Sequence, residues 1–149
     1  MIFRELQLQD TSQMAQIEQD SFSEPWREAS FVEAIEHPEI FFYVAEEAGE
    51  VLAYCGAVES FDEADVVNVA TKKEHRNKGI CKELLQYMMK EEAKKGISRF
   101  SLDVRVSNLA AIHVYESLGF ESAGIRPGFY SKPKEDSNVM WCEWKDIKE

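Results

Sequence analysis

The sequence lacks the patterns that would place the protein in a membrane, outside the cell or around a metal ion. No apolar run approaches the roughly 20 residues that a transmembrane helix requires. The first ten residues, MIFRELQLQD, do not have the basic-then-apolar layout of a secretion signal. The three cysteines, Cys55, Cys81 and Cys142, are widely spaced, with no CxxC pair, which argues against a disulfide framework and a zinc site. These absences predict a cytoplasmic protein with reduced thiols and no bound metal.

Positive charge is also scarce. The 149 residues hold 28 acidic and 17 basic side chains, which gives a formal net charge of -11. Such a chain repels nucleic acid and anionic membranes and attracts cationic partners, although solubility alone explains the acidic excess equally well. The segment from Lys72 to Lys82 is the exception, because its five bases and one acid give a local charge of +4 (5 − 1).

Length and hydrophobic patterning predict one α/β domain over residues 1–149. Alternating or short apolar runs predict strands, and apolar residues at helical spacing predict helices. The predicted order is β-α-α-β-β-β-α-β-α-β-β, a mixed sheet flanked by helices. The expected strands cover residues 2–8, 40–46, 51–59, 66–70, 100–104, 121–125 and 138–143. Helices are expected after Asp10 or Thr11, from Ser23 with Pro25 in the first turn to His37, from the basic segment to Gly96, and from Ser107 or Asn108 to Gly119.

The link between the predicted strand 66–70 and the next helix has the composition of an anion site. A helix N-terminus exposes unpaired backbone N–H groups and a partial positive charge, and Gly79 lets the backbone approach a phosphate closely. Acids are normally favoured in the first turn of a helix, so bases there indicate that an external anion supplies the negative charge. A solvated charged loop is the alternative. Neither the P-loop pattern GxxxxGK followed by Ser or Thr nor the three glycines of a dinucleotide fingerprint are present.

The segment Arg76-Asn-Lys-Gly79-Ile-Cys81 resembles the R/Q-x-x-G-x-G/A motif of the GNAT superfamily of N-acetyltransferases. Cys81 departs from the usual small residue at the last position. The flanking segments VVNVA (66–70) and SNLAAIHVYESLGF (107–120) are similar to the family in the same order and spacing. The resemblance implies a GNAT fold and acetyl-coenzyme A as co-substrate. It further implies that the coenzyme is bound by Val69, Ala70, Thr71, Arg76, Asn77, Lys78, Gly79, Ile80, Cys81 and Asn108.

Within the superfamily, the chain most resembles the RimI-type ribosomal-protein alanine N-acetyltransferases, on Glu24-Pro-Trp26, Arg126-Pro-Gly-Phe-Tyr130 and Glu135-Asp136. This implies acetylation of a protein N-terminal α-amine, such as that of a ribosomal protein, by direct attack in a ternary complex. Trp26 and Tyr130 are then expected to contact the acceptor. Two alternatives stay open: an acetyltransferase for small amines such as polyamines or aminoglycosides, and a coenzyme A-binding module without catalysis.

Asp103 and Tyr115 are expected to carry the chemistry. Asp103 is the only charge in the apolar run 100–104, and a carboxylate inside a strand is uncommon without a partner or a function. By resemblance it stands where the RimI type has a glutamate base, but it is shorter by one methylene, about 1.5 Å, so a water-mediated proton transfer is considered. The alternative is a structural Asp that pairs with Arg105 or caps a backbone group. Tyr115 stands where family tyrosines protonate the leaving thiolate, although its position on a helix alone favours a core residue.

Other side chains fit the chemistry less well. His113 and Tyr115 are related as i, i+2, which puts them on different faces of the helix. Cys55 lies in a predicted buried strand, and Cys81 would be occupied by the phosphate turn. Direct attack is therefore favoured over a covalent cysteine route.

Overall fold

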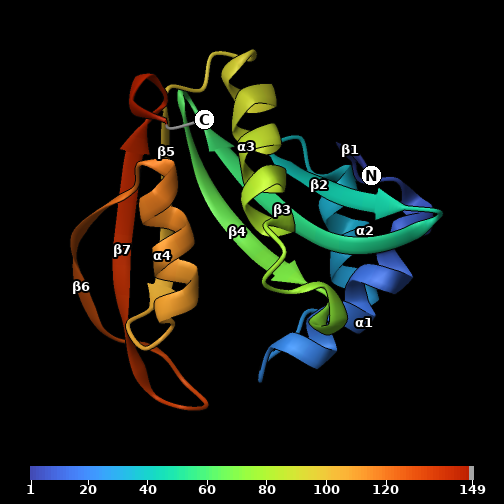
Figure 1. The fold of residues 1–149 in the computed structure, drawn as a ribbon, viewed down its shortest axis with the longest axis horizontal. Coiled ribbons are helices and arrows are strands. Elements are labelled where there is room, and N and C mark those ends of the chain that lie inside the picture. Colours follow the sequence, from blue (N-terminus) through green and yellow to red (C-terminus); the bar gives the residue numbers. More distant parts are fainter. Residues whose placement is uncertain (148–149) are drawn as a thin grey trace.

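The computed structural model describes residues 1–147, which form a seven-stranded sheet with helices on both faces (Figure 1). The strand order is β1-β2-β3-β4-β5-β7-β6, and all neighbours are antiparallel except β4 and β5. The order of elements along the chain confirms the predicted α/β mixed sheet. The strands are β1 (Ile2–Glu5), β2 (Ile40–Glu47), β3 (Glu50–Ser60), β4 (Glu63–Thr71), β5 (Arg99–Arg105), β6 (Glu121–Tyr130) and β7 (Glu135–Glu143). The helices are α1 (Thr11–Ser21), α2 (Glu28–Glu36), α3 (Ile80–Ala93) and α4 (Leu109–Leu118).

The two faces of the sheet bury separate hydrophobic clusters. Helices α3 and α4 cover one face, where Leu84, Met88 and Phe100 belong to the larger cluster (Figure 1). Helices α1 and α2 cover β2, β3 and β4 on the other face, where Met14 and Phe31 are buried. No helix within residues 1–147 is long and apolar enough to cross a membrane. The helical periodicity in the sequence thus corresponds to packing against the sheet.

The first strand is shorter than predicted. It ends at Glu5 instead of residue 8, and a 3-10 helix follows over Leu8–Asp10. The buried Asp10 carboxylate causes this turn, because it accepts hydrogen bonds from the Arg4 guanidinium at 2.7 and 2.9 Å and from the Gln7 backbone N–H at 2.7 Å. Alternating polarity could not reveal this ionic contact.

The second helix begins later than predicted. It starts at Glu28, so Pro25 lies in a loop and not in the first helical turn. The Trp26 backbone N–H donates to the carboxylate of Glu18 on α1 at 3.2 Å, and the Trp26 ring packs on Phe31 with centroids 5.3 Å apart. These contacts tie Trp26 to α1 and α2, and the extended Arg27 leads into the helix.

A buried carboxyl group anchors the end of α3 to the sheet. Glu92 is fully buried, and its Oε2 accepts hydrogen bonds from the Tyr43 hydroxyl at 2.5 Å and contacts the Lys95 ammonium at 2.8 Å. Its Oε1 has no donor among the described residues, and the Glu59 carboxylate is adjacent. Burial and the hydrogen bond with Glu59 raise the pKa of Glu92 to about 7. Although burial acts against it, hydrogen bonding to Glu92 and Lys95 lowers the pKa of Glu59, so the shared proton stays on Glu92.

We expect this carboxyl group to lower the free energy of unfolding as the pH rises from about 5 to about 7. The folded-state pKa of Glu92 is raised from 4.5 to about 7, so in this range the folded protein keeps a proton that the unfolded chain releases. The free energy of unfolding therefore falls as pH rises, by about 3 kcal/mol at most. Glu92→Gln keeps the shape and an acceptor for Tyr43, and should remove most of this slope.

Urea denaturation at a series of pH values measures the slope. Glu91→Gln on the same helix is the matched control, because Glu91 lies near the surface and pairs with Lys94. Its slope should equal that of the wild type. An unchanged slope in Glu92→Gln would show that Glu92 does not titrate in this range.

Candidate functional site

The sheet opens between its two parallel strands. The pairing of β4 with β5 covers only three positions and ends at Asp65 and Ser101. Beyond this point the strands diverge (Figure 1), while β4 remains paired with β3 and β5 with β7. Each strand therefore turns an unpaired backbone edge towards the opening. Such an edge can receive an extended ligand that carries amide groups.

A β-bulge in β4 shapes one side of this opening. Asn68 and Val69 together stand opposite Cys55, a single residue of β3. Asn68 has a φ of 50°, a left-handed conformation that Asn adopts more readily than most residues with a Cβ. Bulges bend a strand and redirect the groups that follow. The bulge thus sets the direction of the predicted cofactor segment Val69–Thr71.

The turn after β4 leads into a helix whose N-terminus is uncapped. Gly79 is the N-cap residue of α3, with φ 80°, and no side chain caps the first turn. The N–H groups of Ile80–Lys82 have no partner within the helix, and the aligned peptides of the 14-residue helix add a partial positive charge. Lys78 and Gly79 are exposed. This arrangement fits a phosphate or pyrophosphate group.

Arg76 braces this turn through protein contacts. Its Nε donates to the Thr71 carbonyl oxygen at 3.0 Å, and its Nη2 donates to the Ser21 hydroxyl at 3.1 Å. Lys72 forms an ion pair with Glu50. Two of the five bases in the segment therefore support the turn, which leaves its backbone N–H groups as candidates for binding an anion.

The thiols close to the opening are protonated at neutral pH. Burial raises the pKa of Cys81, in the first turn of α3, to about 11. Burial also raises the pKa of Cys55 well above its ordinary value. A protonated thiol is a poor nucleophile, so the environment of both residues disfavours covalent catalysis.

Tyr115 is buried on α4 and has a free hydroxyl group. Its ring packs on Phe120 with centroids 5.8 Å apart, and no residue within 1–147 hydrogen-bonds to its hydroxyl. Burial raises the pKa of Tyr115, and Cys81 lies close enough to add to this effect. The phenol therefore remains protonated. The side chain is both a core residue and an available hydrogen-bond donor.

Asn108 has the role of a helix cap. It is the N-cap residue of α4, and its Oδ1 accepts a hydrogen bond from the Ala111 N–H at 3.2 Å. The side chain is exposed, and its amide NH₂ group is not used by the cap. The predicted coenzyme contact of Asn108 would therefore be made by this NH₂ group.

Asp103 points from β5 towards β7 and β6. Its Oδ1 accepts a hydrogen bond from the buried Ser137 hydroxyl at 2.6 Å, and Arg126 Nε lies 3.5 Å from the same oxygen. The alternative that paired Asp103 with Arg105 is wrong, because Arg105 contacts the Glu135 carboxylate at 3.2 Å. The Asp103 side chain is 22% exposed, and its Oδ2 accepts no hydrogen bond from residues 1–147. One carboxylate oxygen is thus fixed and the other is available.

A second carboxylate, Asp65, escaped the sequence-based prediction. It lies at the last paired position of β4, and its Oδ1 accepts a hydrogen bond from the Ser101 hydroxyl at 3.2 Å. Surrounding protein atoms, which displace water, and the Asp103 carboxylate raise the pKa of Asp65. The signal that indicated Asp103 was present here too, because Asp65 is the only charge in the run Ala64–Ala70. The opening therefore has an acidic group on each strand.

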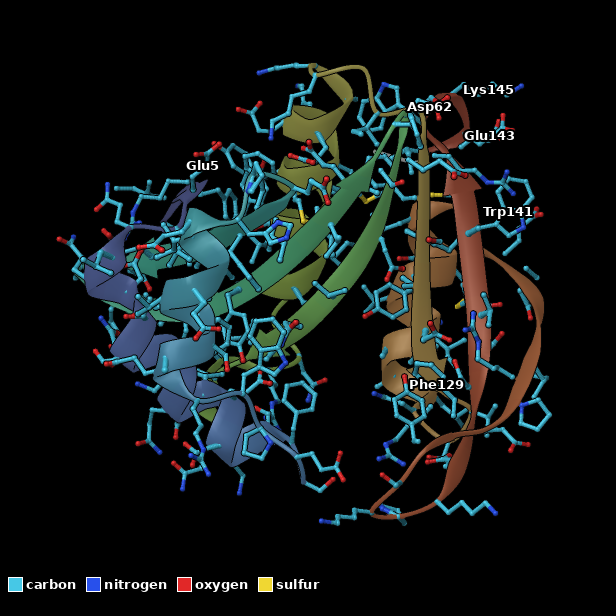
Figure 2. All side chains as sticks on the ribbon, turned by 180° about the vertical axis from the view of Figure 1, so that it is seen from behind. Glu5, Asp62, Phe129, Trp141, Glu143 and Lys145 are labelled. Carbon is cyan, nitrogen blue, oxygen red and sulfur yellow. The ribbon has the colours of Figure 1, made fainter. Side chains whose placement is uncertain are left out.

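The two segments predicted to contact the acceptor meet in space. Glu24, in the loop between α1 and α2, accepts a hydrogen bond from the Ser131 hydroxyl at 3.2 Å and lies 4.0 Å from the Lys132 ammonium. Tyr130 is half-buried beneath the Arg105 guanidinium, 4.4 Å from its ring centroid. Figure 2 shows Phe129, which precedes Tyr130, at the end of the sheet where β4 and β5 diverge.

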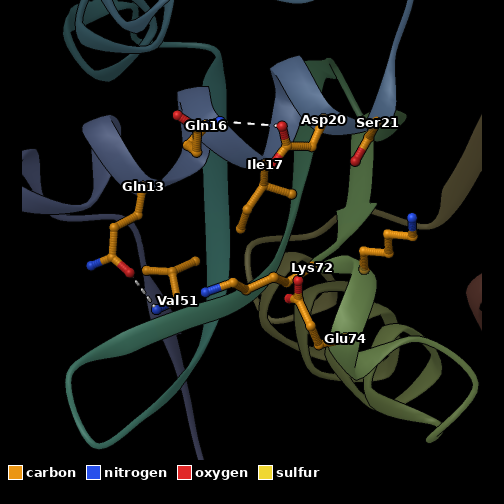
Figure 3. Close-up of a pocket in the computed structure, with 9 residues that line it drawn as sticks. Gln13, Gln16, Ile17, Asp20, Ser21, Val51, Lys72 and Glu74 are labelled. Carbon is orange, nitrogen blue, oxygen red and sulfur yellow. Dashed lines mark hydrogen bonds between the residues drawn. The ribbon is translucent and has the colours of Figure 1, made fainter.

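A separate cavity of 120 Å³ lies between α1 and the connection from β4 to α3 (Figure 3). Gln13 on α1 holds one wall in place, because its Oε1 accepts a hydrogen bond from the Val51 N–H at 2.9 Å. The cavity is lined by Gln13, Gln16, Ile17, Asp20, Ser21, Val51, Lys72, Lys73 and Glu74. None of these is a predicted site residue. The candidate site is therefore the opening between β4 and β5.

Known proteins are similar to this chain in sequence and in fold. The acetyltransferase (GNAT) family model matches residues 11–120. A Bacillus subtilis (strain 168) protein, provisionally named a ribosomal protein bS18-alanine N-acetyltransferase, is 34% identical over 139 residues, which cover 93% of this chain and 92% of the relative. The ribosomal protein bS18-alanine N-acetyltransferase of Escherichia coli (strain K12) is 33% identical over 126 residues, which cover 83% and 84%. The crystal structure of the ribosomal-protein-S18-alanine N-acetyltransferase from Escherichia coli gives a TM-score of 0.87 at 30% identity, covering 95% and 92%.

Gly79→Glu should weaken acetyl-coenzyme A binding by about 100-fold or more, because it places a like charge against a bound pyrophosphate. Gly96→Glu is the matched control: Gly96 follows α3 at its other end, also has a positive φ (100° against 80°), and also faces open space. The two changes therefore strain the backbone similarly, and only one lies at the anion site. Calorimetric titration of both variants measures the difference. Equal affinities in two folded variants would remove the anion-site assignment.

Proposed function

The chain belongs to the GNAT acetyltransferase family and is an N-acetyltransferase, and we propose that its acceptor is the N-terminal alanine of ribosomal protein bS18. The observation that supports acetyl transfer from acetyl-coenzyme A to an amine is the opening at which the free edge of β4, the uncapped α3 and Asp103 of β5 meet. The names of two relatives with 33–34% identity support the acceptor. A ribosomal acceptor would place the reaction in the cytoplasm.

The opening fits acetyl-coenzyme A, which supplies an acetyl group activated as a thioester. The uncapped N–H groups that follow Gly79 would hold the pyrophosphate, with Asn77 and Lys78 beside it. The unpaired edge at Val69–Thr71 offers N–H and C=O groups to the amides of the pantetheine arm, as an added strand would receive them. Asn108 can add a side-chain donor at the start of α4.

Asp103 is suited to take up the proton of the acceptor amine. An α-amine has a pKa of about 7.7–8.0, so a sizeable minority is already neutral at pH 7 and a weak base is sufficient. Ser137 and Arg126 fix one oxygen of Asp103 and leave Oδ2 available. Because the side chain is one methylene shorter than glutamate, a water molecule would carry the proton to it.

Tyr115 is suited to stabilise the leaving sulfur by hydrogen bonding. A thiol has a pKa of about 8.5 and a phenol about 10, so complete proton transfer from tyrosine to a thiolate is uphill. Burial raises the pKa of Tyr115 and increases this difference. The free hydroxyl can nevertheless donate a hydrogen bond to negative charge that develops on the sulfur. Solvent would then supply the proton.

The acceptor assignment predicts a preference for a peptide over a small amine. An Ala-starting peptide with the N-terminal sequence of bS18 should react with a kcat/KM about 100-fold above that of spermidine. The peptide is long enough to contact both predicted acceptor segments, that of Trp26 and that of Tyr130. Release of free thiol from acetyl-coenzyme A measures both rates. The same peptide with a blocked N-terminus is the control and should not react. Equal or faster reaction with spermidine would indicate a small-amine enzyme instead.

The base assignment predicts different outcomes for two substitutions of Asp103. Asp103→Asn should lower kcat by roughly 10²–10⁴-fold with little change in coenzyme affinity. Asp103→Glu should retain most of the activity, because it extends the carboxylate towards the amine. Asp65→Asn is the control, since Asp65 is the acidic group on the opposite strand of the opening. Full kcat in Asp103→Asn together with a large loss in Asp65→Asn would move the role to Asp65.

A further inference from the structure

Glu18 is a buried carboxylate that contacts both sides of the proposed site. It lies on α1 and is 3% exposed. Its Oε1 accepts a hydrogen bond from the Tyr54 hydroxyl at 2.5 Å. Its Oε2 accepts hydrogen bonds from the Trp26 backbone N–H at 3.2 Å and from the Asn68 amide at 3.4 Å. One side chain thus links the loop between α1 and α2, the centre of β3 and the bulge of β4.

The environment of Glu18 is unusual for a structural carboxylate. No lysine, arginine or histidine within residues 1–147 forms an ion pair with it, so hydrogen bonds alone compensate for the buried charge. Replacing a buried polar group together with its partners by apolar groups of the same shape can be nearly neutral for stability, so stability alone does not require this arrangement. The three donors belong to separate parts of the chain. Glu18 therefore fixes the positions of these parts relative to one another.

The two linked parts have different tasks in the proposed reaction. Trp26 belongs to the loop that would contact the acceptor, and its N–H donates to Glu18 two residues before α2 begins at Glu28. Asn68 is the left-handed residue of the bulge, and it precedes the Val69–Thr71 edge that would receive the pantetheine arm. A shift of either part changes the distance between the amine and the thioester.

We propose that Glu18 is a positioning residue that fixes the acceptor loop relative to the β4 bulge. This inference rests on the proposed function, in which the two parts hold the two substrates. The role assigned to Glu18 is support of the site and not proton transfer. It acts through Trp26 and Asn68, and Tyr54 holds its other oxygen.

Glu18→Gln tests the link between Trp26 and Asn68 with almost no change in the shape of the side chain. The Tyr54 hydroxyl can accept from the glutamine NH₂ group, but the single neutral oxygen is a weaker acceptor than the carboxylate for the Trp26 N–H and the Asn68 amide. We expect kcat/KM for the Ala-starting peptide to fall at least tenfold, with both a higher KM and a lower kcat. Acetyl-coenzyme A affinity should change less than threefold, because the helix N-terminus is untouched. Asp20→Asn, on the same helix but exposed, is the control and should behave as the wild type.

Hydrogen exchange of backbone amides gives a readout that does not depend on activity. In Glu18→Gln the Trp26 amide should exchange at least tenfold faster than in the wild type, while amides in the middle of α3 keep their rates. A purely structural role would lower the thermal midpoint but leave kcat/KM at lower temperature equal to that of Asp20→Asn. That result, or an unchanged Trp26 exchange rate, would overturn the proposal.

Asn68→Gly provides a second test if Glu18→Gln does not fold. Glycine keeps the left-handed conformation of the bulge and removes only the amide donor to Glu18. Its kcat/KM should fall at least threefold, and wild-type kinetics would overturn the link to the bulge. If the wild type itself does not acetylate the peptide, the acceptor assignment fails, while amide exchange still decides whether Glu18 holds the loop.

Discussion

The parallel pairing of β4 with β5 stops at Asp65 and Ser101, although each strand stays bonded to its other neighbour. Unpaired backbone groups inside a sheet are costly unless water or a ligand satisfies them. The bulge at Asn68 lies three residues beyond the last paired position of β4, and α3 begins at Ile80, after a short connection, with its own unpaired N–H groups. A ligand with an extended amide arm and a terminal anion satisfies the strand edge and the helix end together. Backbone groups alone therefore offer the contacts that the amide arm and the phosphates of coenzyme A require.

The charge around the candidate site differs from the net charge of the whole chain. A net charge of -11 opposes the approach of an anionic coenzyme, and the bases between Lys72 and Lys82 offset this only nearby. Two of them are engaged elsewhere, Lys72 with Glu50 and Arg76 with Ser21 and the end of β4. The N–H groups at the start of α3, which the sequence already indicated, are therefore the main candidates for binding an anion. The acidic groups Asp65 and Asp103 lie along the opening, where a cationic amine would approach.

Local patterns were enough to predict the order of elements, because each helix and strand buries a periodic apolar face. They failed where a distant residue decides the outcome. The start of α2 depends on the contact of Trp26 with Glu18, and no local signal in Ser23–Arg27 reveals it. Asp103 was singled out from its apolar surroundings, but its partners Ser137 and Arg126 come from β7 and β6 and could not be assigned without strand pairing. Asp65 carries the same signal, a single charge in an apolar run, so its place at the opening was predictable from the sequence.

Two buried glutamates show how neighbours decide what a carboxylate does. Glu18 and Glu92 lie on opposite faces of the sheet, and each accepts a hydrogen bond of 2.5 Å from a tyrosine, Tyr54 on β3 and Tyr43 on β2. Glu92 also lies beside a second acid, Glu59, so a proton is favoured between them and the pair responds to pH. Within residues 1–147, the groups that hydrogen-bond to Glu18 are all donors. A buried glutamate that accepts a hydrogen bond from a tyrosine therefore has two different roles in this protein. Glu92 links stability to pH at the end of α3, whereas Glu18 fixes geometry beside the opening between β4 and β5.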